Sequence, residues 1–257
     1  MGKSTKPNKP GLFAPAGEKA LHAEVFGKQR AAEIEQIGMS HAEYRPIASA
    51  VSGLLAYAGK DYERAERCLG FAFNAGIEPT DDSFFKKYMN ATEVSLEIAP
   101  GVTAELPMSR EAIGLALAEI GQGTGRLDLA IDTVEQLDPT YTAAISLAEL
   151  YSDAGRHDDV VKLTDGTANA DDQSAFLLML RAVALRELGM PDASKEAFKE
   201  ALKRRSTDPA IRHRALLERA ILNAQQGKKA LARKDLERVI ADDSTYPGIA
   251  DLLAALD

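Results

Sequence analysis

The sequence contains no tryptophan, one cysteine and only 6% aromatic residues. The single cysteine, Cys68, excludes an internal disulfide and fits a reducing compartment. No apolar run approaches the roughly 20 residues that a membrane-spanning helix needs, and no signal-peptide core follows the N-terminus. We therefore expect a cytoplasmic location and no interaction with a membrane.

Motifs for catalysis and for metal or phosphate binding are absent as well. The four histidines (His22, His41, His157 and His213) lie in separate segments, and no H-E-x-x-H motif or cysteine pair offers the spacing of metal ligands. The glycine-rich run at residues 121–126 lacks the lysine and the preceding strand of a phosphate-binding loop. Adjacent aspartate pairs lie at expected helix ends or in loops, where aspartate caps free backbone N–H groups. The sequence therefore predicts no enzyme, no cofactor and no metal.

Alanine, leucine, glutamate and basic residues dominate the chain, which favours an all-helical protein. Residues 1–16 hold three prolines and three lysines, and we predict a disordered basic tail there. At 257 residues, the chain is long enough for one elongated domain or two compact ones.

Two neighbouring segments repeat each other between residues 174 and 247. When Gly189 is aligned with Gly227, Ala182 aligns with Ala220, seven residues before the glycine, and apolar residues match eleven before and nine after it. An internal repeat of this length indicates stacked supersecondary units. A small residue at a fixed distance before a turn glycine lets two helices cross closely.

Earlier segments continue the pattern. The turn glycines at 125, 155, 189 and 227 are separated by 30, 34 and 38 residues, with a mean of 34. A further helical pair is expected around Gly59, where Val51 and Ser52 fill the leucine and small positions and the second helix slips by one residue.

This pattern resembles the tetratricopeptide repeat (TPR), in a degenerate form. Arg181 and Arg219 stand where the family has leucine, and Asn223 stands where it has tyrosine. The resemblance implies an all-α, TPR-like right-handed superhelical solenoid of about five helical hairpins. It also implies a protein–protein interaction adaptor, a scaffold that binds a peptide or helix of another protein in its concave groove.

The remaining segments are assigned around these repeats. We expect one solenoid over residues 17–257, with N-terminal helices at 17–77, an irregular insertion at 78–108, repeats at 109–246 and a capping helix at 247–257. Apolar spacing predicts a single amphipathic helix over residues 17–37. The S-x-x-E sequence at 40–43 predicts the next helix start. Cys68 falls on an apolar helix side, which indicates packing rather than chemistry.

The insertion has two interpretations. Apolar residues alternate with polar ones on both sides of Pro100–Gly101, which favours a small β-hairpin over residues 94–106. Alternatively, residues 95–100 close a degenerate second helix of the repeat.

The TPR resemblance also implies a binding groove lined by first-helix residues. The helix around Met179 is apolar nearly all round, which indicates burial on both sides. The expected groove residues are Phe176, Met179, Leu180, Val183, Leu217 and Ile221. A peptide of another protein, part of this chain, or a second copy in a homo-oligomer would cover them.

A basic segment contrasts with the net charge of −8. Residues 199–238 hold twelve Lys and Arg against five Asp and Glu. The basic residues include Lys203, Arg204, Arg205, Arg212, Arg214, Lys228, Lys229, Arg233 and Lys234. They form either solvated outer helix faces or a surface that steers an acidic peptide or RNA. A nucleic-acid- or ribosome-associated protein is therefore the alternative function, although no interleaved aromatic residues are present to stack bases.

Overall fold

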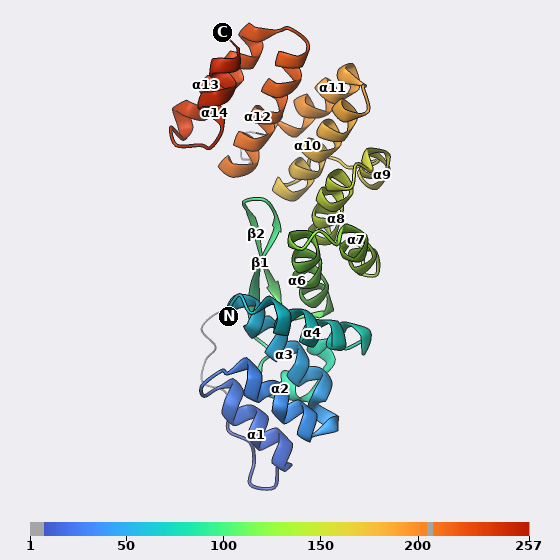
Figure 1. Ribbon diagram of the computed structural model, residues 1–257, viewed down its shortest axis with the longest axis vertical. Coiled ribbons are helices and arrows are strands. Elements are labelled where there is room, and N and C mark those ends of the chain that lie inside the picture. The colour runs from blue at the N-terminus through green and yellow to red at the C-terminus, as the bar shows by residue number, and fades with distance from the viewer. Residues whose placement is uncertain (1–7, 205–207, 257) are drawn as a thin grey trace. The chain divides into compact units, whose positions relative to one another are not determined.

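The computed structural model describes residues 8–204 and 208–256 (Figure 1). The chain divides into two compact units, Met1–Pro139 (unit 1) and Thr140–Asp257 (unit 2). Helices dominate both units, and the sheet found among the described residues is a two-stranded antiparallel hairpin in unit 1. The expected helical class with a small β-hairpin is confirmed. The single solenoid over residues 17–257 stays a prediction.

Over residues 8–139, unit 1 consists of helices with one β-hairpin inserted before the last helical pair. Its elements are α1 (Ala16–Val25), α2 (Ala31–Ser40), the 3-10 turn Ala42–Tyr44, α3 (Arg45–Ala58), α4 (Tyr62–Asn74), the 3-10 turn Pro79–Asp81, α5 (Ser83–Tyr88), β1 (Glu93–Ala99), β2 (Val102–Pro107), α6 (Arg110–Gly123) and α7 (Leu127–Glu135).

Unit 2 contains helices only, among its described residues. They are α8 (Tyr141–Asp153), α9 (His157–Leu163), α10 (Asp172–Glu187), α11 (Pro191–Ala201), α12 (Pro209–Gln225), α13 (Lys229–Asp242) and α14 (Ile249–Ala255).

Four of the helical pairs turn at the glycines that the sequence singled out. Gly125, Gly155, Gly189 and Gly227 have φ values of 73°, 70°, 72° and 72°, and they join α6 to α7, α8 to α9, α10 to α11 and α12 to α13. Glycine enters this left-handed region without the steric cost of a Cβ. The spacing of these glycines in the sequence therefore corresponds to a repeat of helical hairpins in the structure.

The small residue seven positions before each turn lies at the helix crossing. Ala182 is completely buried, and its carbonyl oxygen accepts a hydrogen bond of 2.6 Å from the Ser194 hydroxyl on the next helix. A side-chain hydroxyl of one helix reaches the backbone of the other only where the two helices approach closely. The close crossing of α10 and α11 therefore requires a small side chain at Ala182 and is stabilised by the hydroxyl of Ser194.

The pair α3/α4 shows why its sequence pattern slips by one residue. Its left-handed residue is Lys60, with φ 61°, whereas Gly59 has φ −82°. Counting back seven residues from Lys60 gives Gly53 in place of Ser52. A Cβ on Gly53 would lie 2.6 Å from the Leu69 side chain and 3.0 Å from its backbone nitrogen. Only glycine therefore fits at position 53, where α3 crosses α4.

The N-terminal segment differs from the sequence-based expectation. Residues 17–37 form two helices, α1 and α2, because the chain reverses between them with Gln29 at φ 54°. The Glu24 carboxylate stabilises the break by accepting hydrogen bonds from the Arg30 backbone and guanidinium at 3.1 and 2.9 Å. The helix start predicted at Ser40 is also wrong, because Ser40 ends α2 and its hydroxyl donates to the Gln36 carbonyl at 2.9 Å.

The predicted tail is described only in part. Residues 1–7 lie outside the described residues. Residues 8–15 run alongside α1, where the Asn8 carbonyl oxygen lies 3.1 Å from His22 Nε2 and the Lys19 ammonium donates to the Leu12 carbonyl at 2.6 Å. Leu12 and Phe13 are 83% and 96% exposed.

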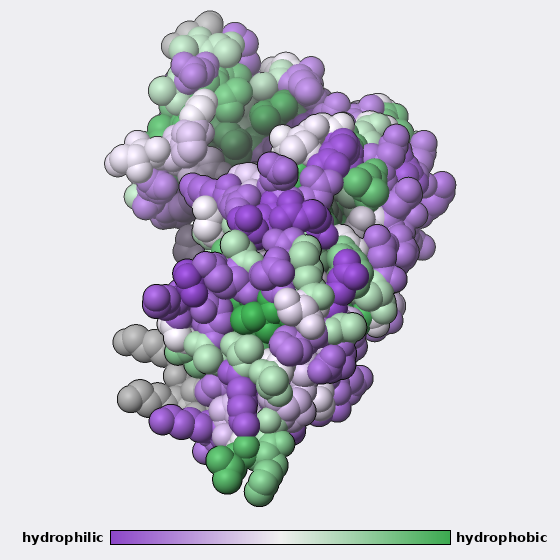
Figure 2. Space-filling model, turned by 60° about the horizontal axis from the view of Figure 1, so that its bottom comes forward, coloured by the Kyte–Doolittle hydropathy of each residue, from purple (hydrophilic) through white to green (hydrophobic). Residues whose placement is uncertain are grey.

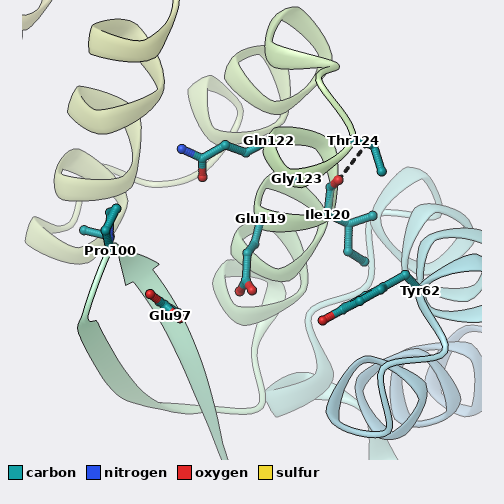
Figure 3. Close-up of a pocket in the computed structure, with 9 residues that line it drawn as sticks. Tyr62, Glu97, Pro100, Glu119, Ile120, Gln122, Gly123 and Thr124 are labelled. Carbon is teal, nitrogen blue, oxygen red and sulfur yellow. Dashed lines mark hydrogen bonds between the residues drawn. The ribbon is translucent and has the colours of Figure 1, made fainter. Parts of the chain in front are cut away.

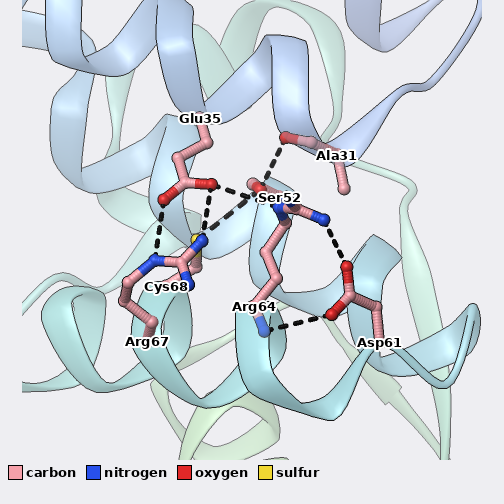
Figure 4. Close-up of polar contacts among 7 residues, drawn as sticks. All are labelled: Ala31, Glu35, Ser52, Asp61, Arg64, Arg67 and Cys68. Carbon is pink, nitrogen blue, oxygen red and sulfur yellow. Dashed lines mark hydrogen bonds and ion pairs between the residues drawn. The ribbon is translucent and has the colours of Figure 1, made fainter.

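A carboxylate on α2 joins this helix to α4 (Figure 4). Glu35 accepts hydrogen bonds from Arg64 at 3.2 Å and from Arg67 at 3.1 and 3.0 Å, both on α4. The two guanidinium groups hold the pKa of this half-buried carboxyl below its usual value, with the Arg67 hydrogen bonds as the main cause. The ionised form of Glu35 is therefore the one that the fold stabilises.

Cys68 lies beneath this network and is buried. The Ser52 hydroxyl lies 3.7 Å from the Cys68 sulfur and donates to the Ala31 carbonyl at 2.8 Å. Burial raises the pKa of the Cys68 thiol. A buried thiol that resists ionisation is a poor nucleophile, which agrees with the packing role expected from the sequence.

No helix in residues 8–204 or 208–256 is long and apolar enough to cross a membrane. On the face drawn in Figure 2, apolar and hydrophilic side chains are interspersed.

Replacing Ala182 by leucine should destabilise the protein by roughly 1–3 kcal/mol, because the larger side chain would overpack the crossing of α10 and α11. Urea unfolding of Ala182→Leu would measure the loss. Ala193→Leu on the exposed side of α11 is the matched control and should change stability by less than about 0.5 kcal/mol. Equal stability of Ala182→Leu and the wild type would contradict the crossing.

Replacing Lys60 by glycine should stabilise the protein by roughly 0.5–1 kcal/mol, because glycine relieves the left-handed strain and only part of the gain is lost to the unfolded chain. Gly189→Ala tests the opposite direction and should destabilise by about 1 kcal/mol. Both changes can be measured by chemical unfolding. A loss of stability in Lys60→Gly would show that its backbone conformation carries no strain.

Candidate functional site at the hairpin

A cavity of about 380 Å³ opens in unit 1 beside the β-hairpin (Figure 3). We call it the hairpin cavity. Its lining residues are Tyr62, Glu97, Ala99, Pro100, Glu119, Ile120, Gln122, Gly123 and Thr124. They come from the start of α4, the end of β1 with its turn, and the last turns of α6. Elements far apart in the sequence therefore form its walls.

The hairpin supplies its wall through the alternation of β1. Val94, Leu96 and Ile98 are buried, while Glu97 lies on the exposed face of the strand. The turn at Pro100–Gly101 reverses the chain with Gly101 at φ 74°, and the Glu97 carboxylate accepts a hydrogen bond of 2.8 Å from the Gly101 backbone. Glu97 therefore both stabilises the turn and lines the cavity.

The helical wall presents a second carboxylate. Glu119 on α6 is half-buried and accepts a hydrogen bond from the Tyr57 hydroxyl on α3. Burial raises the pKa of the Glu119 carboxyl, the nearby charge of Glu97 raises it further, and the Tyr57 hydrogen bond opposes both. Burial also raises the pKa of Tyr57, followed by its hydrogen bond to Glu119. Tyr57 thus keeps its proton and donates a hydrogen bond, and the Glu119 carboxyl ionises less readily than usual.

An aromatic ring forms the third wall. Tyr62 is 45% exposed, and its ring lies 6.3 Å from that of Tyr57 at an interplanar angle of 66°. In Figure 3 the Tyr62 hydroxyl points toward the Glu119 carboxylate, and the Glu97 carboxylate lies on the strand beside them, below Pro100 of the turn. Acceptor oxygens beside an aromatic ring suit a hydrogen-bond donor or a cation. Within the described part of the chain, no group of three or more His, Cys, Asp and Glu side chains is placed to hold a metal ion.

Comparisons with known proteins bear on the fold. No protein-family model matches the sequence, and no curated protein matches it. One similar structure is the N-terminal domain of the EccA1 ATPase from the ESX-1 secretion system of Mycobacterium tuberculosis, at 17% identity and a TM-score of 0.64, covering 93% of this chain and 86% of that one. Another is a tetratricopeptide repeat protein from Parabacteroides merdae, at 10% identity and a TM-score of 0.52, covering 93% and 82%. The chain has a TPR-like fold.

The expected groove residues lie on the first helices of two TPR-like pairs, α10 and α12, in unit 2. Phe176 and Met179 are completely buried and Leu180 is 2% exposed, while Val183, Leu217 and Ile221 are partly exposed. Part of the expected groove is therefore internal packing. A role of these residues in binding stays a prediction.

Residues of the chain itself cover part of this face. The Arg214 guanidinium lies 5.2 Å from the Phe176 ring centre and pairs with Glu149 of α8 at 2.6 Å. Leu217 packs against the core cluster that α14 helps to complete. The terminal helix thus contributes to burial at this end of unit 2.

The two arginines that depart from the TPR pattern have partners. Arg219 on α12 forms a bidentate ion pair with the buried Asp235 of α13, at 2.8 and 2.7 Å. Arg181 on α10 donates to the Val161 carbonyl of α9 at 2.6 Å. Each arginine connects neighbouring helices through polar contacts where the family pattern has an apolar one.

The expected basic face divides into separate groups. Arg214 is paired as described, Lys203 pairs with Glu200 at 3.3 Å, and Arg204 donates to the Ala170 carbonyl. Arg212 is partly buried on α12, and Arg205 lies outside the described residues. The remaining four, Lys228, Lys229, Arg233 and Lys234, lie at the N-cap and in the first two turns of α13. The binding role of this face stays a prediction.

Lys234 also lines a second cavity, of about 290 Å³, in unit 2. The other lining residues are Lys195, Lys199, Arg219, Asn223, Leu231, Asp235 and Arg238. Four basic residues of this lining, Lys199, Arg219, Lys234 and Arg238, belong to the basic segment of residues 199–238, for which the sequence predicted no cavity.

The hairpin cavity was not expected from the sequence. The alternation in β1 locates Glu97 on the polar face of a strand, but Glu119 and Tyr62 carry no local signal that separates them from ordinary surface residues of helices. Their meeting depends on how the hairpin packs against α4 and α6. Only the tertiary structure reveals it.

The folding stability conferred by the Glu119 carboxyl should fall as pH rises. Because its pKa is raised in the folded state, this contribution is fully present below the ordinary pKa and is lost as pH rises through the folded value. Glu119→Gln lacks this titration, so its melting temperature should rise relative to wild type between about pH 4 and pH 8. Glu105→Gln, at an exposed position of β2, is the control. A difference between Glu119→Gln and wild type that is independent of pH would contradict the burial of a titrating carboxyl.

Proposed function

We propose that this chain is a non-catalytic protein-interaction module that binds a segment of a partner protein at the hairpin cavity. The observation that carries the proposal is the cavity itself, which an exposed aromatic ring, two carboxylates and the turn of an inserted hairpin line together. Binding sites of this type combine apolar walls with a few oriented polar groups.

The fold supports an interaction role by analogy. Helical repeats present extended surfaces that bind other macromolecules, and insertions in the repeats map to loops that lie on one face. The β-hairpin is such an insertion, between α5 and α6. Because fold alone does not determine function, the residues of the cavity carry the argument.

The alternative use of basic residues for an acidic partner or nucleic acid is less favoured. Arg214 and Arg219 are already paired with Glu149 and Asp235. A cation that is held by an internal carboxylate has less to gain from an external anion. We therefore assign the primary binding site to unit 1.

A random linear peptide library displayed on phage, selected on the full chain, tests this function. The selected peptides should then crosslink to a chain in which a photoreactive benzoylphenylalanine replaces Thr124 at the rim of the cavity. Benzoylphenylalanine at Asp132, an exposed position of α7, should give no crosslink.

A third variant separates the two candidate sites. Benzoylphenylalanine at Ile221 reports on the face of unit 2 that the sequence analysis favoured. Crosslinking from Ile221 and not from Thr124 would move the binding site to unit 2. If no peptide is selected on the wild-type chain, the interaction function at this site is wrong.

A further inference from the structure

The lining of the hairpin cavity holds two carboxyl groups and no basic residue, and the adjacent Arg126, which donates to Thr124 Oγ1 at 3.0 Å, pairs with Glu66 at 2.8 Å. The two carboxyl groups are those of Glu97 and Glu119. The influences on the Glu119 carboxyl are burial, Tyr57 and the neighbouring Glu97, with no lysine or arginine among them. Two carboxylates that face one cavity repel each other, and a cation between them would relieve that repulsion.

Both carboxylates retain hydrogen-bonding capacity. Glu97 Oε1 accepts from the Gly101 backbone, and Glu119 Oε2 accepts from Tyr57. A carboxylate has two oxygens with about four lone-pair sites in total, so each can accept further donors. An ammonium or guanidinium group supplies several donors at once.

The other walls suit the apolar part of a basic side chain. Ile120, Ala99 and Pro100 offer apolar surface next to the carboxylates. Lysine and arginine bury their methylene chains along such surface while the charged end reaches polar groups. The exposed ring of Tyr62, oriented by its contact with Tyr57, can stack over the cation.

We propose that the hairpin cavity binds a lysine or arginine side chain of the partner segment, with its charged group between Glu97 and Glu119. This inference rests on the proposed function, since the side chain belongs to a partner protein. It adds the chemical class of the ligand: a segment that carries a basic residue.

Four small amides test the chemistry of the cavity independently of any peptide. The probes are the N-acetyl amides of arginine, lysine, citrulline and norleucine, titrated into the full isotope-labelled chain and followed by the backbone amide signals of Gly123 and Thr124. Citrulline and norleucine match the shapes of arginine and lysine without the charge. The two basic amides should bind at least about tenfold more tightly than their neutral counterparts, since charge-assisted hydrogen bonds are the strong ones.

Variants of the chain assign this preference to residues. The double variant Glu97→Gln/Glu119→Gln keeps the shape of both side chains and should abolish the preference for the basic amides. Tyr62→Leu changes an exposed ring and should weaken binding of the basic amides while the signals of the folded chain remain. Equal binding of all four amides, or an unchanged preference in the double variant, would overturn the inference.

The peptide selection distinguishes this result from a failure of the proposed function. Selected peptides should contain a lysine or arginine whose replacement by norleucine or citrulline weakens binding to wild type more than to the double variant. Peptides that crosslink from Thr124 but lack a required basic residue would support the interaction function and refute the inference. Binding of the basic amides without any selected peptide would indicate a site for a free amino acid and refute both.

Discussion

The close crossing of paired helices is the constraint on which the structure depends. Each hairpin from α6 to α13 needs a left-handed residue at its turn and a small residue seven positions earlier, because the backbones meet there. Ala118, Ala148, Ala182 and Ala220 meet this need and are almost fully buried. In the pair α3/α4, Gly53 is the small residue at the crossing and Lys60 is the left-handed residue at the turn. This pair thus has the same turn and crossing as the others, with different residues. Side chains elsewhere on these helices are then free to vary, which explains a recognisable fold without a match to any family model.

The hairpin adds a wall that helices alone would not provide. Its inner face packs through Val94, Leu96 and Ile98, and that packing fixes which way Glu97 points. A shift of one residue in the register of a strand would turn every side chain to the opposite face. The turn is held by the hydrogen bond from the Gly101 backbone to Glu97, so the residue that lines the cavity also stabilises the loop that shapes it.

Sequence reasoning succeeded where the signal was local and repeated. The spacing of Gly125, Gly155, Gly189 and Gly227, and the alternation around Pro100, predicted the helical pairs and the hairpin because each signal reflects backbone geometry. It failed between α1 and α2, where helical periodicity continued through a break made by Gln29 and the pairing of Arg30 with Glu24. It also could not find the hairpin cavity. Glu97 and Glu119 are 22 positions apart, and no periodicity relates a strand residue to a helix residue.

Glu119 differs from several carboxylates of unit 2 in its hydrogen-bond partner. Partly buried arginines in unit 2 pair with carboxylates, as in Arg186–Glu218, Arg214–Glu149 and Arg219–Asp235. In the hairpin cavity, by contrast, the half-buried Glu119 is held by a neutral tyrosine and faces another carboxylate. Partial burial and the nearby charge of Glu97 both disfavour the ionised form of Glu119. A cationic ligand would give Glu119 the kind of counter-charge that Arg186, Arg214 and Arg219 give their carboxylates, which is why we propose a basic side chain on the partner.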